Sequence, residues 1–509
     1  MRFKVVACLP ALLLLLTACA SVGGKSAALT PLPTRALTAV PSATRPPRWT
    51  PTVPGTPTFT ATPPPLISAP PDGIPQVTLS ITLNYADKQM KVGQQVVFSN
   101  AGPDTWDEVV FAVPPAYQPG VFTLHTVTVT TTRQSQQATA ILSGTMLHVF
   151  TPTPIVPGAA VAVALKYTIA IPPVDLNTWL PLGNLGAGER LIQAGDWHPT
   201  LVPYRPGAGW QTWDYTPVGD PNIYGIANYD VMLRADPTLV VAAPGFVTYK
   251  GQVRHFRLDR ARTFAFLVSP EYQVLRGMAG ATPVRVYYLP EYGAAAQAVF
   301  KTAAQAIPLY VELYGPYPYT GLVIAQNAYY GAMEYSGLIS MSSNAYAAYK
   351  ETPVAALINL TAHEIAHQWW YGAVGNDQVH EPWLDESFAK YSELLFYERY
   401  YPDFVDWWWQ HHIYSRNHGG SLDATIYDFA DTPSYIEQVY AQGARFLGDL
   451  RALMGDPAFF TFIKAYREAN DGHIATRDDF FAAVRAHTDA DLTPLVERYF
   501  GKGSPTPGY

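Results

Sequence analysis

The sequence predicts an α+β protein of several domains, in which an antiparallel, β-sandwich-like domain precedes a mainly helical one. Three observations support this class. The chain has 509 residues, of which 48% are hydrophobic and 14% charged, so it exceeds one ordinary domain and is not disordered throughout. Apolar residues alternate with polar ones from about Gln76 to Tyr288, as in half-buried strands. After Pro290 the apolar spacing becomes helical.

The N-terminus predicts an export signal over residues 1–18. Arg2 and Lys4 precede an apolar run, Val5–Leu16, that is shorter than the roughly 20 residues needed to span a bilayer. The following Leu16-Thr17-Ala18-Cys19 resembles a bacterial lipobox. We therefore expect cleavage before Cys19, diacylglycerol on its thiol, and an extracytoplasmic protein anchored to a bacterial membrane. The alternative is an ordinary signal peptide with an incidental cysteine.

Cysteine and charge content narrow the chemistry further. Cys8 and Cys19 are the two cysteines of the chain, so we expect neither disulfides, nor thiolate catalysis, nor cysteine-bound zinc in the mature protein. The formal net charge is −7 and no block of lysines and arginines stands out. This composition argues against a nucleic-acid partner.

Residues 19–72 are predicted to be a linker. This stretch is rich in proline and threonine and contains no acidic residue after Cys19 until Asp72. Such a composition cannot bury enough apolar surface to fold, and it favours extended conformations. We expect it to act as a stalk between the membrane and the globular part.

Residues 73–289 are predicted to form the β-sandwich-like domain. Runs of alternating apolar residues are separated by clusters of Gly, Pro, Asn and Asp, as expected for antiparallel strands joined by turns. The alternating positions that define three of these strands are Val77, Leu79, Ile81 and Leu83, then Val127 and Val129, and then Val161, Val163 and Leu165.

Residues 290–509 are predicted to form the second domain. Ala294–Leu313 is rich in alanine, with apolar residues at helical spacing. Further helices are expected to start near Thr352, Pro382 and Pro433, and a last one to run from Asp478 to Tyr499.

The chemistry of the second domain centres on His363-Glu364-Ile365-Ala366-His367. Thr352 can cap a helix that has Pro353 in its first turn, and Gly372 suits its end. His363 and His367 then lie one turn apart on one face and can bind one zinc ion, while Glu364 points about 100° away. The alternative is a core helix with two hydrogen-bonded histidines.

Two glutamates on the next predicted helix extend this site. Glu386 follows His367 by nineteen residues, on a helix expected to start at Pro382 and end near Tyr401. Its carboxylate would complete a His₂Glu set of ligands and leave a fourth position for water. Glu393 lies on the same helix face and could accept the outer N–H of a ligand histidine. For both glutamates the alternative is an exposed side chain.

Together these segments resemble the gluzincin zinc aminopeptidases, the family of alanyl aminopeptidases and leukotriene A hydrolase, here in a bacterial lipoprotein form. The Trp-Leu-x-Glu context of Glu386 is similar to the family's. Gly331-Ala332-Met333-Glu334-Tyr335 resembles its Gly-x-Met-Glu-Asn motif, and Tyr440-Ala441-Gln442-Gly443-Ala444 resembles its Tyr-x-x-Gly-Ala segment. The resemblance spans roughly residues 197–499.

The resemblance implies a thermolysin-like catalytic domain with one catalytic Zn²⁺ held by His363, His367 and Glu386. Zinc would acidify a bound water and polarise the scissile carbonyl. Glu364 would take the proton from that water, and Tyr440 would donate a hydrogen bond to the oxyanion. For Tyr440 the alternative is an ordinary core tyrosine.

The resemblance also implies how the substrate's amino end is held. Glu334 would bind the free α-ammonium; the alternative is an ordinary loop carboxylate. In the family, a residue of the β domain contacts the same group, and Gln193 and Asp196 are both candidates. Tyr335 stands where the motif usually has Asn, which we expect to alter the pocket for the first side chain of the substrate.

The predicted function is therefore release of N-terminal residues from peptides by a zinc-dependent aminopeptidase. Classical family members continue into a helical C-terminal domain that covers the active site, for which the chain after Tyr440 is too short, so we expect a more open cleft. The alternatives are a zinc endopeptidase with an open cleft and a non-catalytic binding lipoprotein on a peptidase fold.

Overall fold

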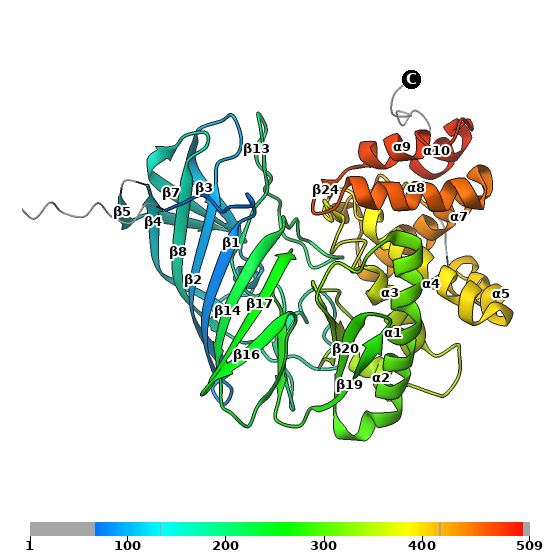
Figure 1. The fold of residues 1–509 in the computed structure, drawn as a ribbon, viewed down its shortest axis with the longest axis horizontal. Helices are drawn as coiled ribbons and strands as arrows, with labels where there is room; N and C mark the ends of the chain where they lie inside the picture. The colour runs from blue at the N-terminus through cyan, green and yellow to red at the C-terminus, as the bar shows by residue number, and fades with distance from the viewer. Residues whose placement is uncertain (1–66, 133, 417–418, 502–509) are drawn as a thin grey trace, which may run out of the picture. The chain divides into compact units, whose positions relative to one another are not determined.

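The computed structural model describes residues 67–132, 134–416 and 419–501. The predicted signal peptide, Cys19 and most of the predicted linker lie outside the described residues. The predicted α+β class is confirmed, because strands of several sheets fill the first half of the described chain and helices dominate the second (Figure 1). None of the helices within these ranges is long and apolar enough to cross a membrane.

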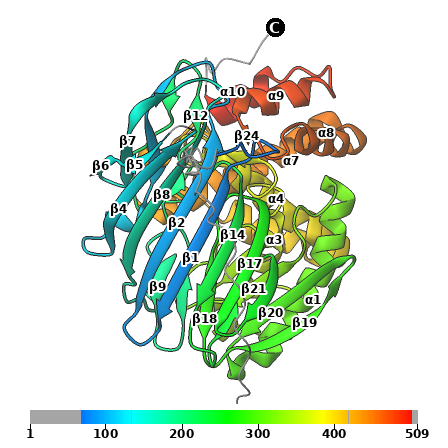
Figure 2. The ribbon, with the colours of Figure 1, turned by 60° about the vertical axis from the view of Figure 1, so that its left-hand side comes forward.

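An eight-stranded sheet forms the framework of the first half (Figure 2). Neighbouring strands pair antiparallel, except that β1 and β14 run parallel. The predicted alternation is confirmed in β1, where Val77, Leu79, Ile81 and Leu83 are buried. Across the sheet the strands are β16 (Phe246–Lys250), β17 (Val253–Ala261), β14 (Ala227–Arg234), β1 (Gln76–Asn84), β2 (Gln89–Ser99), β8 (Ala160–Ala170), β4 (Phe122–Thr131) and β5 (Ser135–Gln137).

Smaller sheets cover the apolar face of this sheet. Leu79 of β1 shares one core with Phe111 and Val149 of one small sheet and with Phe266 of another, so the β-sandwich-like arrangement is confirmed. The small sheets are β11 (Thr200–Leu201), β3 (Trp106–Ala112), β7 (Met146–Ile155) and β6 (Thr139–Ser143); β15 (Val240–Ala242), β18 (Phe266–Ser269), β10 (Ile192–Ala194) and β9 (Leu185–Ala187); and β12 (Tyr204–Arg205) with β13 (Gly209–Trp210).

A further four-stranded sheet crosses the predicted boundary at residue 289. The hairpin of β19 (Gln273–Ala279) and β20 (Thr282–Tyr288) precedes that boundary, and β21 (Leu322–Gln326) and β22 (Leu338–Met341) follow it. β20 pairs parallel with β21 through α1 (Gly293–Tyr314), a β–α–β crossover. An alternating pattern predicts where strands lie but not which strands pair. The β19–β20 hairpin is therefore assigned, from the sequence, to the first domain, with the other strands that precede residue 289.

The helices that carry the predicted metal ligands are α3 (Ala356–Ala366) and α4 (Trp383–Tyr400). The expected starts of α1 and α4 are confirmed to within one residue. The expected start of α3 at Thr352 is wrong, because Thr352 forms a turn with Ala355 and the Pro353 carbonyl accepts a hydrogen bond from Tyr397 Oη at 2.6 Å. α3 also ends earlier than Gly372.

The remaining helices complete the second half. The expected continuous helix from Asp478 to Tyr499 is wrong, because Asp491 accepts the N–H of Thr493, where a new helix starts with Pro494 in its first turn. The helices are α2 (Ser343–Ala347), α5 (Val405–Trp408), α6 (Thr432–Tyr435), α7 (Gly443–Met454), α8 (Asp456–Ala469), α9 (Arg477–Arg485) and α10 (Thr493–Phe500), with π-helical turns over Trp409–Tyr414 and Ile436–Gln442 and a short pair of strands, β23 (Gly375–Asn376) and β24 (Ile474–Ala475).

Candidate active site

Three donor atoms from α3 and α4 converge at a buried point. His363 Nε2 lies 3.1 Å from His367 Nε2 and 3.2 Å from Glu386 Oε2. His367 Nε2 lies 3.4 Å from the same carboxylate oxygen. All three side chains are at most 5% exposed. The structure therefore brings together the three residues that the sequence predicted as metal ligands.

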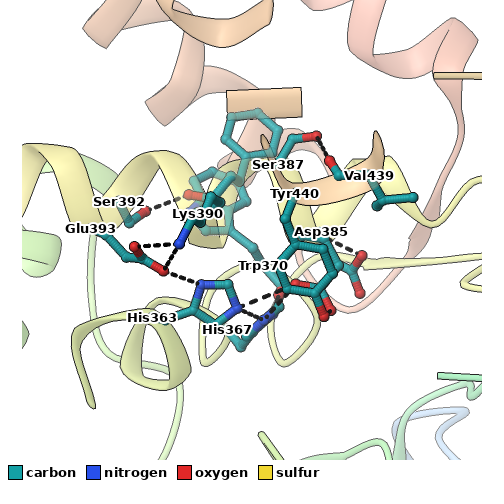
Figure 3. A network of polar contacts seen from close by, with 12 residues as sticks. His363, His367, Trp370, Asp385, Ser387, Lys390, Ser392, Glu393, Val439 and Tyr440 are labelled. Carbon is teal, nitrogen blue, oxygen red and sulfur yellow. Dashed lines mark hydrogen bonds and ion pairs between the residues drawn. The ribbon is translucent and has the colours of Figure 1, made fainter. Parts of the chain in front are cut away.

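The outer nitrogens of both histidines are already engaged (Figure 3). His367 Nδ1 is 2.8 Å from the carbonyl oxygen of Trp370, which can only accept, so this nitrogen carries the proton. His363 Nδ1 is 2.9 Å from Glu393 Oε1, as the helix spacing predicted. In the neutral form of each ring, the Nε2 lone pair therefore faces the other histidine and Glu386.

This geometry fits zinc. Tetrahedral zinc with bonds of about 2.0–2.1 Å places its ligand atoms about 3.3 Å apart, close to the separations between the two histidines and Glu386. Two imidazole lone pairs facing each other also repel unless a cation lies between them. The donor set, two imidazoles and one carboxylate, is that of catalytic zinc sites with an open fourth position.

Two donors besides His363 hold the Glu393 carboxylate. Lys390 Nζ lies 2.8 Å from Glu393 Oε2, and the indole Nε1 of Trp408 donates to the same oxygen at 3.0 Å. Lys390 and the hydrogen bond from His363 keep the pKa of the Glu393 carboxyl far below its usual range, although burial alone would raise it. Glu393 thus stays ionised and fixes the orientation of the His363 ring.

A cavity of about 410 Å³ opens over the site and is lined by Glu364 as well as by the metal donors. Glu364 is buried, and its Oε2 has no hydrogen-bond partner among the described residues. Burial, followed by the nearby Glu334 carboxylate, raises the pKa of Glu364 to about 8. A bound divalent cation would lower this pKa again, bringing the carboxylate into the range of a general base at neutral pH.

Tyr440 lies over the metal donors on the π-helical turn Ile436–Gln442. Its ring stacks on His363 with centroids 5.6 Å apart, and its hydroxyl donates to Glu386 Oε1. Burial raises the pKa of Tyr440 well above its usual value, so the hydroxyl keeps its proton. Gly443 allows this approach, because a Cβ there would lie 1.8 Å from Ser387 Oγ on α4.

Glu334 lies beside the metal donors, paired with an acid that the sequence did not indicate. It is 3% exposed and its Oε1 has no partner within the described ranges. Carboxylate oxygens of Glu334, Glu386 and Asp220 lie within 4.8 Å of one another. Burial raises the pKa of Asp220 well above its usual range, and Glu334 raises it further. Buried carboxylates this close together repel one another when ionised, and a cation beside them would stabilise their charged forms.

The two candidates from the β domain for the substrate's amino end are engaged by other groups. The Gln193 side chain donates to the Gly183 carbonyl and accepts a hydrogen bond from the Ala328 N–H, so it connects the segments that contain these two residues. Asp196 accepts hydrogen bonds from Asn184 and Tyr224. Neither is among the described residues that line the cavity, whereas Asp220 is.

The expectation that Tyr335 shapes the substrate pocket is also wrong. Tyr335 is 2% exposed, lies in the core and is not among the described residues lining the cavity. Its hydroxyl occupies the space that a side chain would take at Gly195, where a Cβ would lie 1.7 Å away. The larger residue therefore fills the contact between two segments and not the pocket.

Comparisons with known proteins agree with this arrangement. Residues 299–499 match the family described as Peptidase family M1 domain. Aminopeptidase N of Lactobacillus helveticus is 29% identical over 228 residues, covering 41% of this chain and 26% of that protein. Human endoplasmic reticulum aminopeptidase 2 is 26% identical over 220 residues, covering 38% and 23%. The chain therefore spans about a quarter of the length of the curated relatives it matches.

Solved structures extend the likeness to the fold. An M1 zinc metallopeptidase from Deinococcus radiodurans superposes with a TM-score of 0.63 at 18% identity, covering 86% of this chain and 96% of that one. Residues 299–499 are therefore similar to a peptidase family M1 domain, and the fold resembles that of an M1 zinc metallopeptidase.

Proposed function

We propose that this protein is a zinc-dependent aminopeptidase that releases N-terminal residues from peptides. The observation that carries the proposal is the buried pair of acids, Glu334 and Asp220, beside the metal donors. A peptide's α-ammonium is the cation that would satisfy this pair while placing the first peptide bond next to the metal site. The names of the relatives, which are aminopeptidases, support the same activity.

The side chains around the cavity divide the chemistry between them. When bound by His363, His367 and Glu386, zinc supplies Lewis-acid chemistry at the scissile carbonyl and acidifies a water. Glu364 takes a proton from the attacking water and passes it to the leaving amine. Tyr440, released from Glu386, donates a hydrogen bond to the oxyanion that forms when the scissile carbonyl is attacked.

We expect peptide cleavage to require a free N-terminus. The zinc-loaded protein is given one peptide with a free amine and the same peptide acetylated, and the products are identified by mass spectrometry. Stepwise release of residues from the free peptide alone supports the proposal. Internal cleavage of both peptides would make the protein an endopeptidase, and cleavage of neither would favour a binding protein.

Substitutions of the two buried acids test whether they bind the substrate's amine. Glu334→Gln and Asp220→Asn are expected to lower kcat/KM on the free peptide by roughly 100-fold and 10-fold, since each removes a charge facing the ammonium. Asp196→Asn is the comparison variant, because it removes a buried carboxylate that lies within electrostatic range of Glu334 but is not among the described residues lining the cavity. An equal loss in all three variants would point to a general effect of buried acids on folding.

We propose further that the protein is extracytoplasmic and is anchored to a bacterial membrane by a lipid on Cys19. The support is the apolar run Val5–Leu16 and the lipobox-like Leu16-Thr17-Ala18-Cys19. We expect the wild-type protein to partition into the detergent phase and Cys19→Ala to remain in the aqueous phase. Equal partitioning of both would contradict the anchor.

A further inference from the structure

The outward face of the eight-stranded sheet carries a line of cations. Lys250 of β16 pairs with Val253 of β17, and Val253 pairs with Arg234 of β14. Thr82 of β1 then lies between Arg234 and Lys91 of β2. The three cations are exposed, and the strand spacing places them about 10 Å apart with one uncharged residue between each pair.

Lys166 of β8 extends this line by one strand. It pairs with Gly93 of β2, two residues along from Lys91, so the two exposed lysines lie on a diagonal about 8 Å apart. We define Lys250, Arg234, Lys91 and Lys166 as the basic row. Among the described residues none of the four forms a salt bridge. Because their charges repel one another, an anionic partner would stabilise the arrangement.

The acidic residues of the same six strands lie away from the basic row. Asp230 is four residues before Arg234, and Asp259 is six residues after Val253. Asp230 also pairs with Arg257 at 3.4 Å. The whole chain carries 40 acidic residues against 33 lysines and arginines. The basic row is therefore a positive region on a protein of negative net charge.

Two acids in the adjoining turns are engaged locally. Asp87, in the turn between β1 and β2, accepts a hydrogen bond from Asn84 at 2.5 Å. Asp236, which follows β14, accepts the N–H of Thr238 at 2.9 Å. Neither acid forms a salt bridge with the basic row among the described residues, so the row stays positive.

Exposed apolar side chains adjoin the basic row. The edge strand β16 exposes Phe246 and Tyr249, by 67% and 72%, and Met232 of β14 is 38% exposed. Tyr249 directly precedes Lys250, and Met232 lies two residues before Arg234 on the same face. Aromatic, apolar and basic side chains together are typical of surfaces that rest in the interfacial region of a bilayer. A soluble polyanion would pair with the charges and leave the apolar groups in water.

This face takes no part in the active site. The smaller sheets pack on the opposite, apolar face. Figures 1 and 2 show α3 and α4 on that other side of the sheet as well. None of the described residues that line the active-site cavity comes from β16, β17, β14, β1, β2 or β8. A partner bound to the basic row would therefore use no group of the catalytic site.

The linker has the same sign of charge as the basic row. Asp72 accepts a hydrogen bond from Asn228 of β14 at 2.8 Å, so the chain joins the globular part at this sheet. Residues 19–66 contain no acidic residue and four basic ones, Lys25, Arg35, Arg45 and Arg48. Both the linker sequence and the sheet that it joins are thus complementary to an anionic surface.

We propose that the basic row and its apolar neighbours dock the globular part onto a bilayer that contains anionic phospholipids. The four cations bind headgroup phosphates, and Phe246 and Tyr249 enter the interfacial region. The inference extends the proposed membrane anchor by giving the globular part a membrane-facing side. It does not require the lipid on Cys19.

Vesicle sedimentation tests this contact in the absence of the anchor. The parent protein is the mature chain, residues 19–509, with Cys19→Ala, so that it carries no lipid. The probes are sucrose-loaded vesicles of phosphatidylcholine, alone or mixed equally with phosphatidylglycerol, at low and high salt. Soluble polyphosphate is the third probe.

Two triple variants of the parent carry the same change in net charge. The row variant combines Lys91→Glu, Lys166→Glu and Arg234→Glu. The control variant reverses three exposed lysines of the second half, Lys301→Glu, Lys350→Glu and Lys464→Glu. If the row variant melts at a lower temperature than the parent, glutamine at the same three positions removes the charges without reversing them.

We expect the parent to bind the vesicles that contain phosphatidylglycerol, to bind those of phosphatidylcholine far less, and to bind less as salt rises. The row variant should lower the partition coefficient by about 10²-fold, and the control variant by less than about threefold. An equal loss in both variants, or binding that neither variant changes, would overturn the docking surface. Row-dependent binding of polyphosphate without binding of vesicles would overturn the bilayer as the partner.

The same proteins separate this inference from the proposed activity and anchor. All three should cleave a peptide with a free N-terminus at the same kcat/KM, because the substituted residues do not line the cavity. Loss of vesicle binding with full activity therefore counts against the docking surface alone. The anchor is tested independently by the detergent partitioning of the protein that keeps Cys19.

Discussion

Replacing Glu364 by Gln is expected to lower kcat/KM on a peptide with a free N-terminus by about 10³-fold, without loss of bound metal. General bases contribute about 10² to 10⁴ to the rate, and the amide cannot accept the proton of the attacking water. Glutamine has nearly the same shape, and Glu364 is not one of the converging metal donors. The site should therefore still form around His363, His367 and Glu386.

Metal content and thermal stability provide the controls for this variant. Elemental analysis should find one zinc per chain in both proteins, and the melting temperatures should agree within a few degrees. Glu386→Gln is the contrasting variant, since it removes a donor and should lose the metal as well as the activity. Glu364→Gln protein that retains activity within tenfold would show that another group takes the proton.

Replacing Arg262 by Met is expected to lower the free energy of unfolding by about 3–5 kcal/mol. Arg262 is 1% exposed and directs its guanidinium at the carbonyl oxygens of Tyr224, Tyr371, Ala373 and His473. Burial lowers its pKa, and among the described residues no carboxylate pairs with it. Methionine would fill much of the volume but remove the donor of the Tyr224 and Tyr371 carbonyls, whereas those of Ala373 and His473 would keep the N–H of Gly472 and Gly375.

Urea titration followed by tryptophan fluorescence measures this change. The matched control is Arg257→Met, because Arg257 lies on β17, which ends just before Arg262, and its side chain is 68% exposed. Exposed substitutions of this kind usually change stability by less than about 0.5 kcal/mol. If both variants unfold at the same urea concentration, the carbonyl contacts of Arg262 contribute little to stability.

Arg262 also bears on the metal site through the segment that follows α3. Tyr371, whose carbonyl it binds, has a φ of 124°, a conformation that non-glycine residues rarely adopt. This residue lies four positions after His367, close behind the helix that carries the histidines. The hydrogen bonds of Arg262 are thus positioned to stabilise a strained turn directly behind the metal ligands.

The parts of the site set by local geometry were predictable from the sequence. His363 and His367 lie one helical turn apart, and Glu393 lies two turns after Glu386, so their shared faces follow from the helix period alone. Asp220 could not be found this way. It sits in an irregular loop, in Asp220-Pro221-Asn222, and only the folding of that loop against α4 and Glu334 brings it to the site.

Long-range pairing explains the other differences between sequence and structure. The alternating residues of β19 and β20 predict strands but leave open which sheet they join. Likewise, Thr352 and Pro353 have the composition of a helix start, yet a hydrogen bond to Tyr397, 44 residues away, holds them in a turn. Local preference yields to tertiary contacts of this kind whenever the two differ by a few kcal/mol.

Because β20 pairs with β21, the segment that matches the family is shorter than the segment that must fold together. The family match begins at residue 299, after both strands of the β19–β20 hairpin. A polypeptide cut at that point would expose one edge of β21, a strand whose five residues are all buried, and would also lack Arg262. Residues 299–499 alone are therefore not expected to fold as an independent domain. A chimera with a related protein should include the β19–β20 hairpin and Arg262 as well.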